Sequence, residues 1–202
     1  MSAAKNYLEL SLHEFLNDAA GKSPTPGGGS VAALTGALAV SMARMVLAYT
    51  VGKRRFAEHD TDLRKATDEF ARAGEMFEQL MAEDMAAYER FAAAQQSEDE
   101  EEQQHALATA AAVPLEMAAV ADVFSTRMNE IKAMVNPNLY SDLRVAAILA
   151  AAAAEAAAVN VRINLNALQD STQAGQLCQQ LNELLRRVQT NREQIVAYEP
   201  SR

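Results

Sequence analysis

The stretch LRKATDEFARAGEMFEQLMAEDMAAYERF, residues 63–91, predicts one long amphipathic helix. Its apolar residues recur at alternating steps of three and four, which is the spacing of a buried helical seam. Asp84 occupies the one position of this seam where an apolar residue is expected. A carboxylate there is costly without a partner, so Asp84 either fixes helix register or is a functional group. The seam comprises Leu63, Ala66, Phe70, Ala73, Phe77, Leu80, Ala87 and Phe91.

Helix signals continue over the rest of the chain, and no strand pattern interrupts them. The composition is rich in Ala, and few glycines lie outside one loop, which favours helix over sheet. We therefore expect an all-α fold, with residues 1–202 forming a single helical bundle of long antiparallel helices. Besides the seam helix at about 60–95, helices are expected at about 11–20, 30–51, 98–135, 142–168 and 173–198.

Cap residues set the expected helix boundaries. Ser and Asp side chains commonly accept hydrogen bonds from the free amides of a first helical turn, and glycine commonly ends a helix. The expected starts are a capping box at Ser11 and Glu14, Ser30, a second capping box at Ser97 and Glu100, and Ser141 or Asp142; the expected stops are Gly21 and Gly52.

Three further features predict how the helices pack. Ala33, Ala37 and Ser41 form a narrow strip of small residues that would let another helix approach closely. Pro114 removes a backbone hydrogen bond and should kink or divide its helix. The segment 142–168 is apolar on nearly every side, so we expect it to be central and surrounded.

Composition excludes several classes of protein. A formal net charge of −9 argues against general binding to nucleic acid. The lone cysteine cannot form an internal disulfide, and the N-terminal segment lacks the pattern of a secretory signal, so we expect a cytoplasmic protein. The most apolar run, Val145–Val159, is interrupted by Glu155 and is expected to be too short to span a membrane. The histidines are scattered and make no metal-ligand spacing with the cysteine, so no metal is expected.

A Pro- and Gly-rich loop, KSPTPGGGS at residues 22–30, precedes the second expected helix. Gly-rich turns at helix starts bind anions through free backbone amides and the helix dipole. The loop lacks the lysine of a nucleotide-binding P-loop, and an all-helical chain lacks the βαβ unit of a dinucleotide site. It is either a tight connector or a binding loop for another kind of ligand.

A few polar residues remain open between structural and functional interpretations. Lys53 begins the basic run Lys53–Arg55, which is either a solvated turn or a place for an anionic substrate. Asn160 and Asn164 share one face of an apolar helix, where their amides need partners from the protein or from a ligand. Asn136 and Asp142 flank a turn, for which both residue types are common in any case.

Taken together, these segments resemble the cyclodeaminase/cyclohydrolase family of folate enzymes. The resemblance runs in family order over about residues 8–166 and rests on the glycine loop together with the SD and NVxxN motifs. The matching segments are SPTPGGGSVAALTGALAVSMARMV (23–46), GKRRF (52–56), EDMAAY (83–88), VPLEMA (113–118), NPNLYSD (136–142) and NVRINL (160–165).

The resemblance implies an all-helical homodimer with a tetrahydrofolate derivative as substrate and no metal. Two activities occur in the family: closure of 5-formiminotetrahydrofolate to 5,10-methenyltetrahydrofolate with loss of ammonia, and hydrolysis of the methenyl compound to 10-formyltetrahydrofolate. It implies Asp84 as the acid or base, with Lys53 pairing with Asp84 or holding the anionic part of the folate. The implied binding residues are Ser23, Pro26, Gly27, Gly28, Gly29, Ser30, Asn136, Ser141, Asp142, Asn160 and Asn164.

The chain departs from the common family pattern at three positions. Phe56 replaces a usual tyrosine, while Val135 and Ala156 stand where glycine is common. These departures bear on cleft shape and leave a rival hypothesis, a non-catalytic helical protein that keeps the fold and binds folate. No motif separates the two activities, and family grounds slightly favour the cyclodeaminase.

Overall fold

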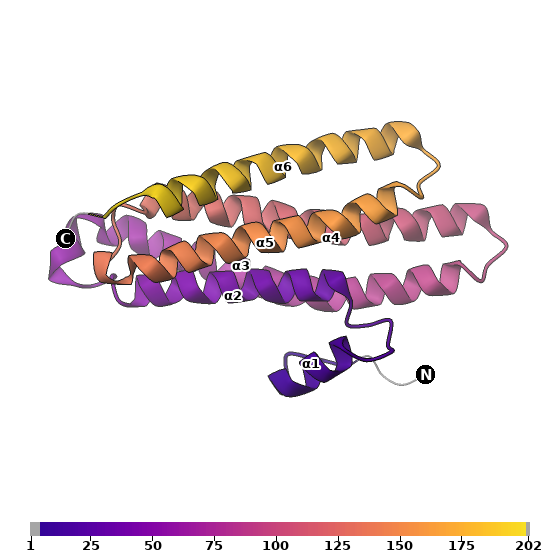
Figure 1. Ribbon diagram of the computed structural model, residues 1–202, viewed down its shortest axis with the longest axis horizontal. Helices are drawn as coiled ribbons and strands as arrows, with labels where there is room; N and C mark the ends of the chain where they lie inside the picture. The colour runs from indigo at the N-terminus through magenta and orange to yellow at the C-terminus, as the bar shows by residue number, and fades with distance from the viewer. Residues whose placement is uncertain (1–4, 201–202) are drawn as a thin grey trace.

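The chain folds into an elongated helical bundle, and the computed structural model describes residues 5–200 of it (Figure 1). No strand occurs within that range, so the expected all-α fold is confirmed. The expectation of no secretory signal rests partly on residues 1–4, which lie outside the described residues. The helices are α1 (Leu12–Ala19), α2 (Gly28–Ala48), α3 (Asp60–Ala94), α4 (Glu100–Ile131), α5 (Tyr140–Leu165) and α6 (Ser171–Ala197), with short 3-10 helices η1 (Arg54–His59) and η2 (Pro137–Leu139).

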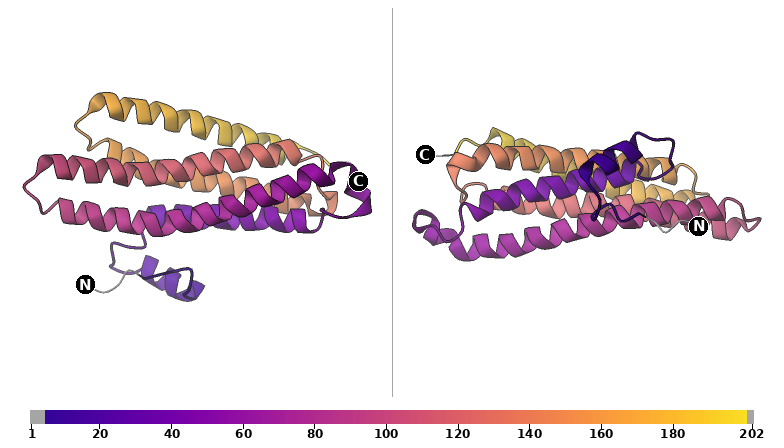
Figure 2. Two further views of the ribbon diagram at one scale, coloured as in Figure 1. Left: turned by 180° about the vertical axis from the view of Figure 1, so that it is seen from behind. Right: turned by 90° about the horizontal axis from the view of Figure 1, so that it is seen from below.

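Four long helices form a ring in which α2 packs on α3, α3 on α4, α4 on α5, and α5 on α2. Helix α6 covers α4 and α5 on one side, whereas α1 lies apart from the bundle near the start of α2 (Figures 1 and 2). Buried apolar side chains fill the ring, and the largest of those on α3 and α4 include Phe70, Phe77 and Phe124. The seam on α3 is buried as predicted, except that Phe91 is only half-buried.

Helix α5 is less enclosed than its sequence suggested. It packs against α2, α4 and α6, but the remaining side is open. Val145, Ile148, Val159 and Ile163 are exposed there, each by more than two fifths of its surface. The expectation that this helix is surrounded on all sides is therefore wrong, because three neighbours leave one apolar stripe uncovered.

Helices α2 and α3 approach closely through glycine. A Cβ atom on Gly36 would come within 2.4 Å of the Phe77 ring, so only glycine leaves room for that buried ring. Ala33 lies in the buried face of α2, but Ser41 is exposed and Ala37 only half-buried. The predicted strip of Ala33, Ala37 and Ser41 is thus wrong as the contact line.

Several helix starts differ from the predicted ones. The capping box at Ser11 and Glu14 is confirmed, with the Ser11 hydroxyl accepting from the Glu14 amide. The other expected caps are wrong, because residues beside them take the cap position or the helix starts earlier. The observed N-caps are Gly27 in place of Ser30, Asp99 in place of Ser97, and Leu139 in place of Ser141 or Asp142.

Pro114 lies inside α4 without dividing the helix. Proline has no amide hydrogen, so the carbonyl of Ala110, four residues earlier, loses its helical donor. The side-chain amide of Asn164 on α5 donates to that carbonyl at 2.8 Å. One of the two predicted amides of α5 therefore has a structural role, which is to satisfy the backbone group that Pro114 leaves free.

Three helices are long and apolar enough to cross a membrane by length and composition alone: Gly28–Ala48, Glu100–Ile131 and the segment Pro137–Leu165. The expectation that no apolar run is long enough is therefore wrong. In the bundle these three helices pack against one another, so much of their apolar surface is covered by protein.

The pairing of Asn164 with Ala110 predicts a coupled pair of substitutions. Asn164→Ala should lower the free energy of unfolding by about 1–3 kcal/mol, because a partly buried carbonyl loses its donor. In a Pro114→Ala background the restored backbone amide supplies that donor, and the same substitution should cost less than about 1 kcal/mol. Urea denaturation of the four proteins measures both values, with the exposed Asn166→Ala as a control. Equal losses in the two backgrounds would contradict this role.

Candidate active site

Apart from Asn164, whose amide pairs with the Ala110 carbonyl, the predicted site residues fall into two groups at opposite ends of α2. One group surrounds the start of α2, and the other lies at the turn that follows its end. A helix of 21 residues is about 30 Å long, so the groups are separated by roughly that distance. The first comprises Ser23, Pro26, Gly27, Gly28, Gly29, Ser30, Asp84 and Asn160; the second comprises Lys53, Asn136, Ser141 and Asp142.

Asp84 and the glycine loop meet in one close contact. The Ser30 hydroxyl donates to the Asp84 carboxylate at 2.9 Å. A Cβ atom placed on Gly29 would lie 1.9 Å from Asp84 Oδ1, so the carboxyl occupies the space that any other residue would fill. The two anomalies of the sequence, a glycine run and a carboxylate in an apolar seam, are therefore two sides of the same contact.

Burial changes the pKa of the Asp84 carboxyl. Removal from water raises the pKa of Asp84 above its ordinary value of 3.8, and hydrogen bonds from the hydroxyl and backbone amide of Ser30 oppose part of that rise. No lysine or arginine within residues 5–200 contributes to the shift of this pKa. Asp84 is thus a carboxyl that holds its proton to higher pH than usual, as a group for proton transfer requires.

Asn160 and the loop complete the first group. A Cβ atom on Gly28 would lie 3.2 Å from Asn160 Oδ1, so α5 and the start of α2 also meet closely. The Asn160 amide donates to the Ala156 carbonyl at 3.0 Å, and its oxygen has no partner within the described chain. Pro26 is buried after a cis peptide bond, while Ser23 is exposed and donates to the Thr25 carbonyl at 2.7 Å.

The second group lies where α2 ends beside the start of α5. The Asn136 amide points to the Tyr49 carbonyl at 3.5 Å, and its oxygen caps the turn by accepting from the Asn138 amide. Lys53 and Ser141 are exposed, and Asp142 is half-buried. The predicted pairing of Lys53 with Asp84 does not occur within one chain, because α2 and α3 hold the two residues at opposite ends.

Tyr88 is a residue that the sequence did not single out. It follows Asp84 by one helical turn and so lies on the same side of α3. The residue is 42% exposed. A tyrosine one helical turn from an aspartate is common on protein surfaces, so the sequence carries no signal for Tyr88. Only the position of Asp84 in the structure draws attention to this residue.

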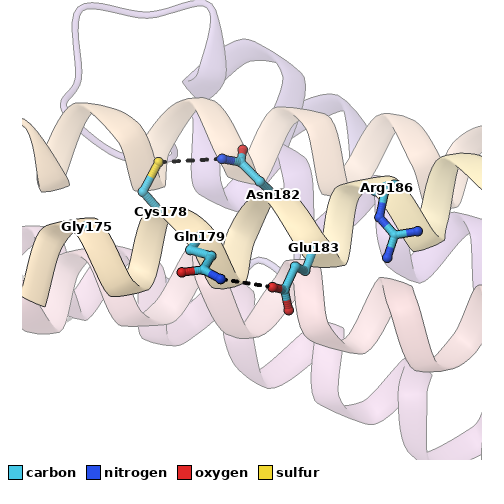
Figure 3. A pocket seen from close by; sticks show the side chains of 6 residues that line it. All are labelled: Gly175, Cys178, Gln179, Asn182, Glu183 and Arg186. Atoms are coloured by element: carbon cyan, nitrogen blue, oxygen red, sulfur yellow. Dashed lines mark hydrogen bonds between the residues drawn. The ribbon is translucent and has the colours of Figure 1, made fainter.

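Three hollows elsewhere on the surface do not include these groups. One lies along α6 and is lined by Gly175, Cys178, Gln179, Asn182, Glu183 and Arg186 (Figure 3). Its residues come from a single helix, so it has no opposing wall. Another, beside the end of α2, is lined by Ser41, Arg44 and Thr67, among others.

The largest of the three hollows, about 760 Å³, is a groove between α3 and α4 with Phe70 and Phe124 in its lining. Two ion pairs lie in its lining: Arg127 with Glu69 at 2.7 Å, and Arg187 with Asp122 at 2.8 Å. These pairs leave the Asp84 contact as the better candidate for chemistry. Within residues 5–200, no three His, Cys, Asp or Glu side chains gather as a metal site would need.

Fold and site together define a class of helical-bundle protein in which a half-buried carboxyl meets glycines at a helix start. The family model described as formiminotransferase-cyclodeaminase matches residues 11–183. The chain belongs to this family, which confirms the resemblance seen in its motifs.

Relatives of both kinds are similar to this chain. Methenyltetrahydrofolate cyclohydrolase of Methylorubrum extorquens is 30% identical over 184 residues, covering 87% of this chain and 88% of that protein. Formimidoyltransferase-cyclodeaminase of Rattus norvegicus is 29% identical over 92% of this chain, which spans only 36% of that longer protein. The structure of formiminotetrahydrofolate cyclodeaminase from Thermotoga maritima matches with a TM-score of 0.90 and 31% identity, covering 93% of this chain and 94% of that one.

The raised pKa of Asp84 predicts how stability depends on pH. Between pH 3.8 and the raised pKa the folded state binds more protons than the unfolded state, so the free energy of unfolding falls as pH rises. The Asp84→Asn side chain cannot ionise, so the free energy of unfolding of this variant should not show this decrease. The variant should therefore be more stable than the wild type near neutral pH, with the smallest difference below pH 3.8. Urea denaturation at several pH values measures this, with exposed Asp68→Asn as control; a destabilised Asp84→Asn at neutral pH would refute the assignment.

The contact with Gly29 predicts an opposite pair of glycine substitutions. Gly29→Ala should destabilise the protein by about 1–3 kcal/mol, because the new methyl group displaces the Asp84 carboxyl. Gly175→Ala, where a Cβ meets no atom within 4 Å, should stabilise α6 by up to about 1 kcal/mol. Thermal unfolding of both variants gives the comparison. A Gly29→Ala variant with the stability of the wild type would contradict a close contact between Gly29 and Asp84.

Proposed function

We propose that the chain is a 5-formiminotetrahydrofolate cyclodeaminase, which forms 5,10-methenyltetrahydrofolate and releases ammonia. The observation that carries the proposal is the Asp84 carboxyl, whose pKa burial raises and which Ser30 and Gly29 hold at the start of α2. Family membership supports a folate substrate. The structural likeness to a cyclodeaminase over almost the whole of both chains supports this activity in particular.

The reaction needs proton transfer at nitrogen, which Asp84 is suited to provide. N10 attacks the formimino carbon on N5, a C–N10 bond forms, and the bond from that carbon to the formimino nitrogen breaks. The departing nitrogen leaves as ammonia after taking the N10 proton and one proton from solvent. Protonated Asp84 delivers a proton to the departing nitrogen and recovers the one that N10 loses. In this proposal no metal ion takes part.

The start of α2 supplies binding as well as chemistry. Gly28 and Asn160 form a wall on the α5 side, where the partnerless Asn160 oxygen accepts a hydrogen bond from the pterin. Part of the anion-binding capacity of this helix start is already taken by Asp84 itself. The Ser30 amide and hydroxyl therefore orient Asp84, and Ser23 and Gly27 border the folate from the loop side.

The alternative function is methenyltetrahydrofolate cyclohydrolase, which the relative of that name supports with 30% identity over most of both chains. Water then adds to the methenyl carbon, the bond from carbon to N5 breaks, N5 takes one proton from the water, and the other is released. Asp84 acts first as the base that removes the proton from water. The same carboxyl serves both reactions, so its geometry does not favour one over the other.

We also propose that the protein is a cytoplasmic homodimer with neither nucleic acid nor membrane as a partner. The net charge of −9 supports the absence of nucleic acid. Packing of the three long apolar helices against one another supports a role away from the membrane.

An absorbance assay tests the proposed activity. Purified protein is incubated with 5-formiminotetrahydrofolate and, separately, with methenyltetrahydrofolate, while the methenyl absorbance and ammonia are followed. Growth of the absorbance with ammonia release is expected, and accelerated decay of the methenyl compound would instead establish the cyclohydrolase. Asp84→Asn should reduce the rate about 10²–10⁴-fold, as loss of an acid or base does.

Exposed Asp68→Asn on the same helix serves as the control and should keep wild-type activity. Activity with neither substrate, or an Asp84→Asn variant as fast as the wild type, would favour the rival hypothesis of a non-catalytic folate-binding protein.

A further inference from the structure

The side of α3 that faces α2 becomes more exposed toward the start of α2. Phe77 and Met81 on this side are 0% and 4% exposed. Asp84 is half-buried, and Tyr88, one helical turn further, is 42% exposed. Steps of four, three and four residues separate these side chains, so they lie on one stripe of the helix. Exposure therefore rises along a single stripe, from the buried core to Tyr88.

The place where α2 begins explains this gradient. Gly36 meets the ring of Phe77, and Gly29 meets Asp84. Both contacts move by seven residues in opposite directions, so the two helices are antiparallel and keep one register. Helix α2 begins at Gly28. The level of Tyr88 therefore lies before the first turn of α2, where α3 continues to Ala94 without α2 beside it (Figure 1).

Tyr88 is close to the proposed reacting group and has no aromatic partner. Residues four apart on a helix have Cβ atoms about 5–6 Å apart, which is the separation expected for Asp84 and Tyr88. The aromatic pairs within residues 5–200 join other rings, so the ring of Tyr88 is unpaired in the described chain. A single exposed aromatic side chain needs no explanation by itself. Its position one turn beyond Asp84, where α2 ends, gives it a possible ligand.

The proposed substrate has an aromatic ring at a matching distance from its reacting carbon. N10, which attacks the formimino carbon, is bonded directly to the p-aminobenzoyl ring. The centre of that ring lies two bonds and half a ring from the reacting carbon, or roughly 4 Å. Aromatic rings pack with their centres about 4.5–7 Å apart. A substrate whose reacting carbon lies at Asp84 therefore brings its p-aminobenzoyl ring within reach of Tyr88.

We propose that Tyr88 stacks on the p-aminobenzoyl ring of the folate and so selects folates over simple pterins. The substrate then lies across the start of α2, with its pterin against Gly28 and Asn160 on the α5 side and its p-aminobenzoyl ring on the α3 side. The inference rests on the proposed function, because the ligand is the proposed substrate. Stacking needs the ring of Tyr88 and not its hydroxyl, so phenylalanine can take its place.

Removal of the ring tests the contact through kinetics. Tyr88→Leu should raise KM for the folate substrate about tenfold and change kcat less than about threefold, because a contact made before and during the reaction affects binding alone. Tyr88→Phe keeps the ring and should stay within about twofold of the wild type in both values. Circular dichroism should show unchanged helicity, since position 88 is exposed. An active Tyr88→Leu enzyme with the KM of the wild type, or a Tyr88→Phe enzyme as impaired as Tyr88→Leu, would overturn the role of the ring and leave the proposed function standing.

A shortened ligand tests which ring of the folate Tyr88 meets. 5-Formyltetrahydrofolate contains the p-aminobenzoyl ring, whereas 5-formyl-6-methyltetrahydropterin keeps the pterin and the formyl group but lacks that ring. In calorimetry, Tyr88→Leu should bind the folate about tenfold more weakly than the wild type does. Both proteins should bind the shortened ligand with equal affinity. An equal loss for the two ligands would overturn the assignment to the p-aminobenzoyl ring.

Fluorescence tests the position without any activity. The chain contains no tryptophan, so Tyr88→Trp introduces a reporter with no background from other tryptophans. Its fluorescence should be quenched by 5-formyltetrahydrofolate, with the Kd that calorimetry gives, and little changed by the shortened ligand. Met76→Trp places the same reporter in the groove between α3 and α4 and should not respond. A response of Met76→Trp alone would place the folate in that groove and overturn the proposal.

The same measurements separate this inference from the proposed activity. Quenching of Tyr88→Trp in a protein that converts neither substrate would support the binding role of Tyr88 and refute the enzyme. Conversion of a substrate without quenching at position 88 would overturn the role of Tyr88 alone. A wild type that neither binds nor converts a folate would overturn both.

Discussion

The contact between Asp84 and Gly29 is the constraint on which the rest of the site depends. A carboxyl oxygen lies where a Cβ atom would be, and the next residue along α2, Ser30, donates its hydroxyl to the same carboxyl. The contact requires a glycine at the start of α2 and a carboxylate in the α3 seam. It also requires the close approach of the two helices that Gly36 permits further along. Burial of the carboxyl, which raises its pKa, follows from this packing.

Much of this arrangement could be predicted from the sequence. The seam from Leu63 to Phe91 fixed the period and length of α3, and it exposed Asp84 as the residue out of place. Helix periodicity can be read from neighbouring residues alone, so it predicts a helix without any knowledge of tertiary contacts. The sequence drew most attention to the glycine loop and to Asp84, and the structure brings these two features together. Their distance in sequence gave no sign of this contact, because nothing local specifies which helix face meets which glycine.

The errors have a common origin in relations between helices. Ser30 looked like an N-cap, but its hydroxyl is committed to Asp84 and the helix begins earlier, at Gly28. Asn164 stays a predicted binding residue, and the structure adds a second role, because its amide donates to the carbonyl that Pro114 frees. The pairing of Lys53 with Asp84 ignored the length of α2, which holds the two ends of the bundle apart.

A crystal structure with 5-formyltetrahydrofolate, a stable folate that carries its one-carbon group on N5, tests the central claim most directly. We expect the formyl group within about 3 Å of the Asp84 carboxyl, as proton transfer requires, with the pterin against Gly28 and Asn160. A folate bound in the groove between α3 and α4, with Asp84 in contact with Ser30 alone, would contradict the assignment of Asp84 as the reacting group.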